Sequence, residues 1–438
     1  THEIKVEAVK DQRPGMQGKD VQISYIPYTG SLLARSVASP FEMYHGRIKH
    51  EGTMKIYENL LDASGKMFLE GAELQSGLIH CKPEQILSAK AALNIASVLN
   101  KDIHLNTSDV KAIIDLSTNT GKFVNNGGGN RLTFSSSQYH CSFENFTWYM
   151  KETYLNIGME EQEQLAKVWK LEQEDSIPAM AKNRFVSSNR LLDSLNFIVP
   201  LARYDLKSGD IACRWVNHID VANGRFYPAK GEMDIQANGD IQEFEDGRLL
   251  CERTDPAKLL TAVKFKLKGK NDFNGSGNYL YVSEEKKKSV LHFMELGRDS
   301  AKLIFAKAQV KAEEPLYLNN GIRFKGNVVL YSRKPDLWFA GYAGLTTDTV
   351  HVKHNWVRVQ DYLASAHIRI PLKIENRNDK QQRIYNAIYL NTDKSFTPYA
   401  SFMSSRRFYN DDLLIGGEGK LEWSLGMEQY IISDTLCD

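Results

Sequence analysis

Short runs in which apolar and polar residues alternate recur along most of the chain. The densest series lies between Leu191 and Glu252, where each run is followed by a glycine that favours a turn, namely Gly209, Gly224, Gly231, Gly239 and Gly247. Alternation with a period of two places apolar side chains on one face of a β-strand. The pattern therefore predicts a sheet that winds back on itself many times.

The same rhythm begins near Val21 and continues through the first third of the chain. Here we interpret Gly52, Gly65, Gly71 and Gly77 as the turns between successive strands. Residues 83–100 are compatible with an amphipathic helix or with strands, and the flanking alternation favours strands. A helix is predicted for 159–175, because Leu165, Val168, Trp169 and Leu171 share one helical face.

These patterns predict an all-β fold. We expect an elongated β-solenoid, either a β-helix or an open β-jellyroll of the β-taco type, with one short helix. The predicted organisation is an irregular lead-in at 1–22, a β-solenoid segment at 23–153, a helical insertion and linker at 154–190, and a second β-solenoid segment at 191–438. The inward residues should form one apolar seam that includes Phe197, Val199, Ile211, Ile235 and Phe265.

Composition narrows the possible roles. The chain has 438 residues and a net charge of +1, so no strong field attracts nucleic acid, and no nucleic-acid partner is predicted. No apolar run reaches the roughly 20 residues of a membrane-spanning helix. The chain begins with Thr1, which is expected of a processed protein or of a piece of a larger one.

The reactive residue types form no pattern that identifies an active site. The five cysteines are scattered, and we expect buried free thiols, with a Cys213–Cys251 disulfide as the alternative. The pairs His351/His354 and His45/His50 lack a third ligand nearby in the sequence. Clustered carboxylates, such as those at 243–255, fit solvated turns. No catalytic residue, cofactor or metal is therefore predicted.

Aromatic residues near turns provide the one candidate binding surface. Trp338, Phe339, Tyr342 and Trp356 could stack on a sugar or contact a lipid, and the alternative is that they belong to the core.

The densest stretch resembles the OstA-like unit of lipopolysaccharide-transport proteins. In that unit an Ala-x-Tyr-Asp strand leads through a glycine turn into further short strands; the matching residues here are Ala202, Tyr204, Asp205, Gly209, Ile211, Val221, Gly224 and Ile235. The resemblance covers about 60 residues of the chain. It implies an open β-jellyroll, which in that family carries acyl chains in an apolar trough.

Two further resemblances suggest export. Residues 271–282, 322–345 and 408–423 are similar to segments of large envelope proteins of Gram-negative bacteria. Asp-Ser/Thr-aliphatic triplets resemble O-glycosylation sites of exported proteins in one group of such bacteria. Their hydroxyl residues are Ser176, Ser194, Ser300, Thr349 and Thr435.

The sequence thus predicts a non-enzymatic exported envelope protein, located in the periplasm or on the outer-membrane surface. It would serve as a scaffold or binding surface, as a partner of an outer-membrane assembly or lipid-transport machine. Other envelope proteins are the expected partners, and lipids or glycans are possible ligands. The alternatives are a carbohydrate-active β-helix enzyme, either a lyase or a glycosidase, and a glycan-binding surface adhesin.

Overall fold

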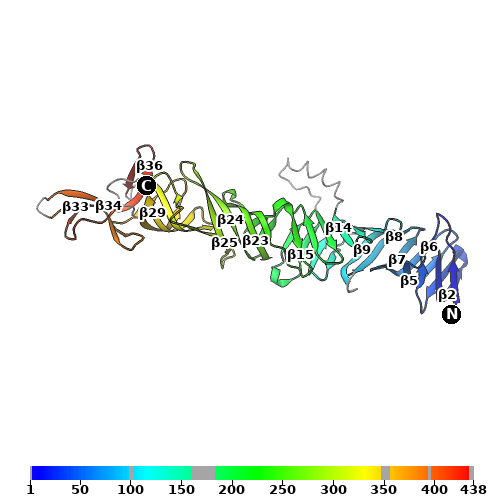
Figure 1. The fold of residues 1–438 in the computed structure, drawn as a ribbon. Helices are drawn as coiled ribbons and strands as arrows, with labels where there is room; N and C mark the ends of the chain where they lie inside the picture. Colours follow the sequence, from blue (N-terminus) through cyan, green and yellow to red (C-terminus); the bar gives the residue numbers. More distant parts are fainter. Residues whose placement is uncertain (1, 98–102, 159–182, 347–355, 393–395, 434–438) are drawn as a thin grey trace. The chain divides into compact units, whose positions relative to one another are not determined.

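The computed structural model describes residues 2–97, 103–158, 183–346, 356–392 and 396–433. Strands make up most of these residues (Figure 1). Within the described ranges the helical elements are short 3-10 turns, η1 (Pro27–Thr29), η2 (Arg190–Leu192), η3 (Ala229–Gly231) and η4 (Pro256–Lys258). The predicted all-β class is confirmed. The helix predicted for 159–175 lies outside the described residues.

The contacts divide the chain into two compact units. The first contains residues 1–220, 227–243 and 267–270, and the second contains 221–226, 244–266 and 271–438. Residues 191–220 therefore belong to the first unit, so the division does not follow the predicted segment boundary at 190–191.

The strands up to β21 have the following bounds: β1 (His2–Val6), β2 (Met16–Ile26), β3 (Ser31–Ser36), β4 (Phe41–Met43), β5 (Ile48–Ile56), β6 (Leu61–Leu69), β7 (Ala72–Cys81), β8 (Gln85–Ala96), β9 (Ile103–Asp115), β10 (Thr120–Asn125), β11 (Leu132–Phe134), β12 (Tyr139–Ser142), β13 (Asn145–Tyr149), β14 (Tyr154–Gly158), β15 (Arg184–Ser187), β16 (Asn196–Ile198), β17 (Leu201–Asp205), β18 (Ile211–Arg214), β19 (Ile219–Val221), β20 (Gly224–Tyr227) and β21 (Met233–Ile235).

The later strands have these bounds: β22 (Phe244–Leu250), β23 (Leu259–Gly269), β24 (Asp272–Val282), β25 (Lys288–Arg298), β26 (Ile304–Val310), β27 (Leu316–Tyr317), β28 (Ile322–Tyr331), β29 (Leu337–Leu345), β30 (Trp356–Leu363), β31 (Ile370–Leu372), β32 (Glu375–Arg377), β33 (Arg383–Leu390), β34 (Pro398–Ser404), β35 (Asp412–Gly416), β36 (Gly419–Ser424) and β37 (Gln429–Ser433).

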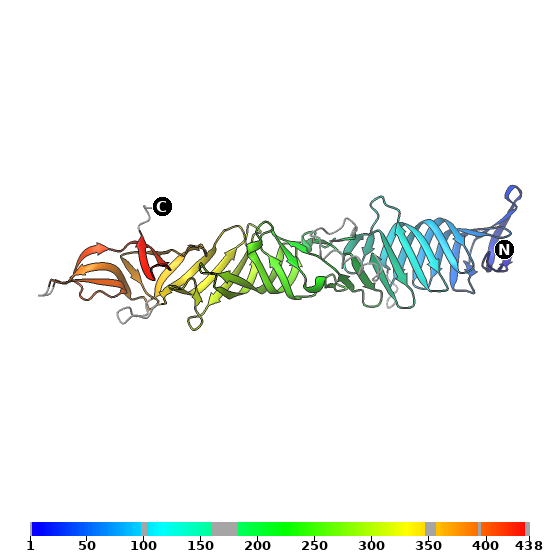
Figure 2. The ribbon, with the colours of Figure 1, turned by 90° about the horizontal axis from the view of Figure 1, so that it is seen from above.

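The first unit begins as a simple meander. Strands β5 to β9 each pair antiparallel with the next along the chain, and Figure 2 shows them side by side in blue and cyan. Strand β8 occupies most of residues 83–100, so the preference for strands over a helix is confirmed there. In β8, Ile86, Ala91, Leu93 and Ile95 are buried.

The prediction of an irregular lead-in at 1–22 is wrong for residues 2–6. Residues 2–6 form β1, which pairs antiparallel with β2 from His2 opposite Val21 to Val6 opposite Met16. Ile4 and Val6 alternate with polar residues in β1, but the strand has five residues and none of them is buried. Such a short alternation is weak evidence for a strand, and the main-chain ladder with β2 is what establishes it.

After β9 the chain alternates between two series of antiparallel ladders. One series continues from β9 through β10, β13, β14, β17, β18 and β21. The other continues from β9 through β11, β12, β15, β16 and β19. The chain changes series after every second strand from β11 to β18. These pairings differ from the parallel ladders of a parallel β-helix.

Aromatic rings fill the space between the two series. Phe134 of β11 lies 5.1 Å from Tyr204 of β17, between ring centroids, and thus connects one series to the other. Phe185 stacks on Phe134 at 5.8 Å and on Phe197 at 6.0 Å. All of these rings are buried. The predicted inward residues Val199, Ile211, Ile235 and Phe265 are also buried, as expected.

Glycines have two different roles in this fold. Gly209 and Gly239 lie in turns at positive φ, as predicted. Gly52 and Gly65, interpreted as turns, instead face each other in the middle of β5 and β6. A Cβ on Gly52 would come within 2.1 Å of the Ser64 carbonyl oxygen, so the two backbones approach too closely for any side chain.

The second unit continues as an antiparallel meander and ends in two small sheets. Strands β24, β25, β26, β28, β29 and β30 pair in that order. In one small sheet β33 lies between β34 and β35 and also pairs with β32. The other contains β31, β36 and β37.

Candidate functional site

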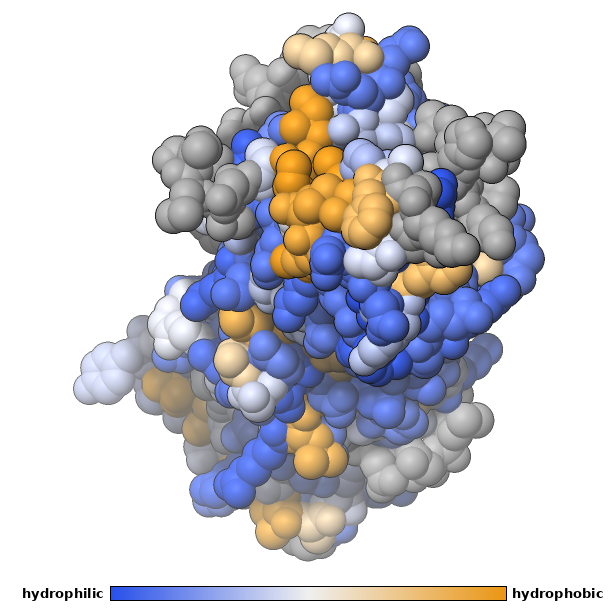
Figure 3. All heavy atoms as spheres, turned by 90° about the vertical axis from the view of Figure 1, so that its left-hand side faces the viewer, coloured by the Kyte–Doolittle hydropathy of each residue, from blue (hydrophilic) through white to orange (hydrophobic). Residues whose placement is uncertain are grey.

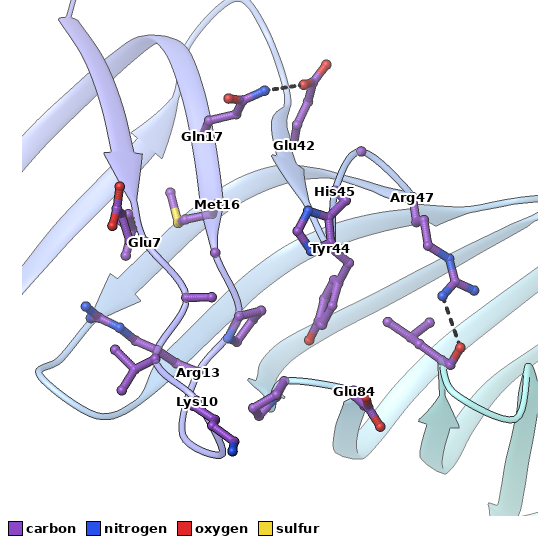
Figure 4. Close-up of a pocket in the computed structure, with 18 of the residues that line it drawn as sticks. Glu7, Lys10, Arg13, Met16, Gln17, Glu42, Tyr44, His45, Arg47 and Glu84 are labelled. Atoms are coloured by element: carbon purple, nitrogen blue, oxygen red, sulfur yellow. Dashed lines mark hydrogen bonds between the residues drawn. The ribbon is translucent and has the colours of Figure 1, made fainter.

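An open groove of about 1140 Å³ lies in the first unit. Most residues of 5–17 line one wall, and the other comes from Glu42 of β4 and from three turns, those between β4 and β5, between β7 and β8, and between β9 and β10. Figure 4 shows Lys10 on the first wall, across from Tyr44 and Glu84, whereas the Arg13 side chain extends away from them. The groove therefore presents both signs of charge.

Arg47 connects two of the turns that form the groove. The Arg47 guanidinium donates to the Leu116 carbonyl at 3.0 Å and to Oδ1 of Asn119 at 2.7 Å, which joins the β4–β5 turn to the β9–β10 turn (Figure 4). Arg13 donates to the Tyr57 carbonyl at 2.5 Å, outside the groove lining. The hydrogen bonds of Arg47 are charge-assisted and hold these two turns of the groove together.

Two ionisable groups at or beside the groove, Tyr44 and Asp115, are poorly suited to proton transfer. Tyr44 is buried and donates to the Lys82 carbonyl at 2.8 Å, and burial raises the pKa of its hydroxyl far above the ordinary value. Hydrogen bonds from Ser117 and Gln85 hold the pKa of Asp115 well below its ordinary value. A general acid or base needs a pKa near the working pH, so neither group suits that role.

The predicted aromatic binding residues differ in their exposure to solvent. Phe339 is fully buried against Phe324, with the ring centroids 5.0 Å apart, so its assignment to a binding surface is wrong. Alternation along β29 places Phe339 on the opposite face from Trp338 and Tyr342, which remain half-buried. Binding through these two residues stays a prediction.

Trp356 belongs to a cation–aromatic cluster that the sequence analysis missed. The Lys325 ammonium lies 4.4 Å from its ring centroid and 2.5 Å from Oδ2 of Asp379, and the Arg323 guanidinium lies 5.0 Å from the same ring. Trp356 is only 9% exposed. Alternation in 322–326 already placed Arg323 and Lys325 on one face, but only the β28–β29–β30 pairing places them beside Trp356.

The histidine pairs do not form a metal site in the described residues. His45 is exposed in a turn, whereas His50 is fully buried in β5. His351 and His354 lie outside the described residues. Among the residues that are described, no group of three or more His, Cys, Asp or Glu side chains could hold a metal ion.

We predict that the buried His50 makes the stability of the fold depend on pH. Its ring stacks on Phe41 with the centroids 6.1 Å apart, and burial lowers its pKa below the ordinary value. Below about pH 6.5 the unfolded state binds a proton that the folded state excludes, so stability falls as the pH falls. Between pH 7 and pH 5 the unchanged protein should lose up to about 2 kcal/mol of its free energy of unfolding, and we expect His50→Phe to abolish this loss. Urea unfolding at the two pH values measures the difference.

The matched control is His45→Asn, which suits the positive φ of that exposed turn residue. If His50→Phe keeps the full pH dependence of the unchanged protein, the buried imidazole is not its source.

Two of the predicted O-glycosylation residues have accessible positions. Ser194 is exposed in the turn after η2, and Ser300 is exposed in the turn between β25 and β26. Ser176, Thr349 and Thr435 lie outside the described residues. Modification stays a prediction. Cys213 and Cys251 are buried free thiols, so the alternative disulfide between them is not formed.

The structure gives the Ala-x-Tyr-Asp stretch a physical role. Oδ1 of Asp205 accepts hydrogen bonds from the amides of Lys207 and Ser208, and Gly209 then takes a positive φ. The same turn follows β9, where Oδ1 of Asp115 accepts from the amides of Ser117 and Thr118. The turn at Gly209 was predicted, but its recurrence after β9 was not, although the Asp-Leu pairs at 115 and 205 indicate it.

The chain matches no protein-family model, and no curated protein is significantly similar to it. In the described part of the chain, no helix is both long and apolar enough to cross a membrane.

Proposed function

We propose that the protein is a non-enzymatic, exported envelope protein that serves as a scaffold or binding surface. It would act as a partner of an outer-membrane assembly or of a lipid-transport machine. One observation carries this proposal: the interior between the two ladder series of residues 132–204 is filled, which favours binding on outer surfaces. Phe134, Phe185 and Tyr204 are each 0% exposed in that interior.

The filled interior helps to distinguish an acyl-chain carrier from a scaffold that binds other envelope proteins. An acyl-chain carrier needs an open apolar trough, whereas stacked rings at centroid distances of 5.1 to 6.0 Å occupy the interior of residues 132–204. Apolar interiors packed in this way hold few voids. A scaffold with outward binding surfaces fits this packing better than a lipid conduit does.

The proposed setting rests on the resemblance to OstA-like units and to envelope proteins. The alternating ladder series are compatible with the open β-jellyroll that this resemblance implies, because they are built from short antiparallel hairpins. We propose further that the alternating ladders form a winding solenoid.

Purification of the tagged protein from its native membrane tests the proposal. We expect envelope proteins to co-purify in stoichiometric amounts, without bound acyl lipid in the protein after it is separated from them. Stoichiometric lipid in the isolated protein would indicate a carrier instead. A control preparation with an unrelated tagged β-protein defines the background.

The groove favours glycan binding as a second candidate function. It is open, and its exposed Lys10, His45 and Glu84 could hydrogen-bond to sugar hydroxyls. A glycan panel that measures both binding and cleavage separates an adhesin, which binds without turnover, from a lyase or glycosidase. Lack of binding across the panel would exclude both for the glycans tested.

A further inference from the structure

The small sheet of β33 carries an exposed apolar surface that the sheet's own core does not use. The core consists of Tyr385, Ala387 and Tyr389, with Ile374 and Tyr399 packed against it. All five residues of β35 are exposed, among them Leu413, Leu414 and Ile415. This strand therefore exposes three consecutive aliphatic residues to solvent.

Aromatic residues of two neighbouring connections add to the exposed apolar area. We call the combined surface the apolar tip; its members are between 49% and 80% exposed and are Phe396, Phe408, Tyr409, Leu413, Leu414 and Ile415. Figure 3 looks at the end where β33 and β34 lie in Figure 1 and shows hydrophobic residues gathered there, bordered by hydrophilic ones. A gathered patch of this kind indicates an interaction surface.

The geometry of β35 disfavours pairing with another strand. Ile415 and Leu413 lie opposite Ile388 and Tyr389, which are adjacent in β33, so Leu414 has no opposite residue. Such a bulge bends and twists an edge strand and is a known protection against edge-to-edge pairing. The side chains of the tip, rather than its main chain, are therefore the available contact groups.

Buried hydrogen bonds hold the tip in place. Asp411 is buried and accepts from the Tyr399 hydroxyl and from the Phe408 amide at 3.1 Å. Its other oxygen accepts from the Thr392 amide at 3.4 Å. The carboxylate thus connects both loops and directs its charge inward, so the tip is preformed.

Two arginines place positive charge beside the tip. The Arg406 guanidinium lies 4.7 Å from the Tyr409 ring centroid, and that of the exposed Arg407 lies 4.7 Å from the Tyr399 ring centroid. In residues 405–416 they outnumber the single exposed carboxylate, Asp412. Aliphatic side chains flanked by aromatic rings and arginines match the membrane–water interface, where arginine pairs with lipid phosphate.

From these observations we propose that the apolar tip docks on an anionic lipid surface. The aliphatic and aromatic side chains enter the interfacial region, and Arg406 and Arg407 contact the phosphates. This proposal rests on the second unit alone and stands independently of the scaffold function.

Vesicle flotation of the full chain tests the proposal. We expect binding to vesicles of phosphatidylcholine with phosphatidylglycerol, and weaker binding to phosphatidylcholine alone. The triple variant Leu413→Ser, Leu414→Ser, Ile415→Ser should lower the partition coefficient at least about tenfold. Arg406→Gln with Arg407→Gln should lower it about tenfold on the anionic vesicles only.

The matched control changes three exposed leucines of the first unit, as Leu60→Ser, Leu78→Ser and Leu191→Ser. It should bind like the unchanged protein, and circular dichroism should give the same thermal transition for all variants. Three results would overturn the proposal: no flotation of the unchanged protein, equal losses in the control, or a dimer in vesicle-free solution that only the tip variant abolishes.

Discussion

Replacing Gly52 with alanine should destabilise the first unit by at least about 3 kcal/mol. Gly52 has φ +142°, a conformation that side chains rarely adopt, and its new Cβ would lie 2.1 Å from the Ser64 carbonyl oxygen. Gly65 lies opposite Gly52 and is equally crowded, because a Cβ added there would lie 2.2 Å from the Glu51 carbonyl oxygen. Backbone atoms cannot rotate away as a flexible side chain can, so β5 and β6 would have to separate.

Hydrogen exchange of peptides from β5 and β6 measures this effect directly, because local opening reports local stability. The matched control is Gly77→Ala in the neighbouring β7, where a Cβ meets open space and φ is not positive. We expect the control to stay within about 0.5 kcal/mol of the unchanged protein. Equal exchange in the two variants would show that β5 and β6 do not need the close contact.

The second large effect is expected for Phe185→Ala, at about 3 to 5 kcal/mol. Phe185 is 0% exposed and stacks on both Phe134 and Phe197, so truncation leaves a cavity between the two ladder series. Calorimetry of the full chain should show a lower transition temperature for the first unit.

Phe185→Leu serves as the comparison for this cavity, because it keeps much of the apolar volume and should cost clearly less than alanine. If leucine and alanine cost the same, stacking between the rings rather than filled volume supports the interior. If neither variant changes the transition, the interior between the ladder series does not stabilise the unit.

Local patterns predicted the strand content well, because alternation and turn residues act within a few positions. Residues 83–100 were assigned to strands from their flanking rhythm, and β8 is found there. The turn at Asp205 to Gly209 follows from a carboxylate that accepts neighbouring amides and from a glycine at positive φ. Both features depend on contacts close in sequence, so sequence reasoning could reach them.

Long-range pairing escaped that reasoning. Nothing local distinguishes a glycine in a turn from one that faces another glycine across a ladder, as Gly52 faces Gly65. The exposed Leu413, Leu414 and Ile415 resemble a core strand by sequence, yet no described residue buries them. The groove could not be predicted for the same reason, because its two walls come from residues far apart along the chain.

The sequence by itself thus determined that this protein is all-β, with short strands, tight turns and an apolar inward face. Only the tertiary structure decided which strands pair, because antiparallel ladders join residues far apart through main-chain groups that every residue shares. That pairing filled the interior with Phe134, Phe185 and Tyr204 and turned Phe339 inward. It also left the apolar tip on the outside, where an anionic lipid surface can be tested as its partner.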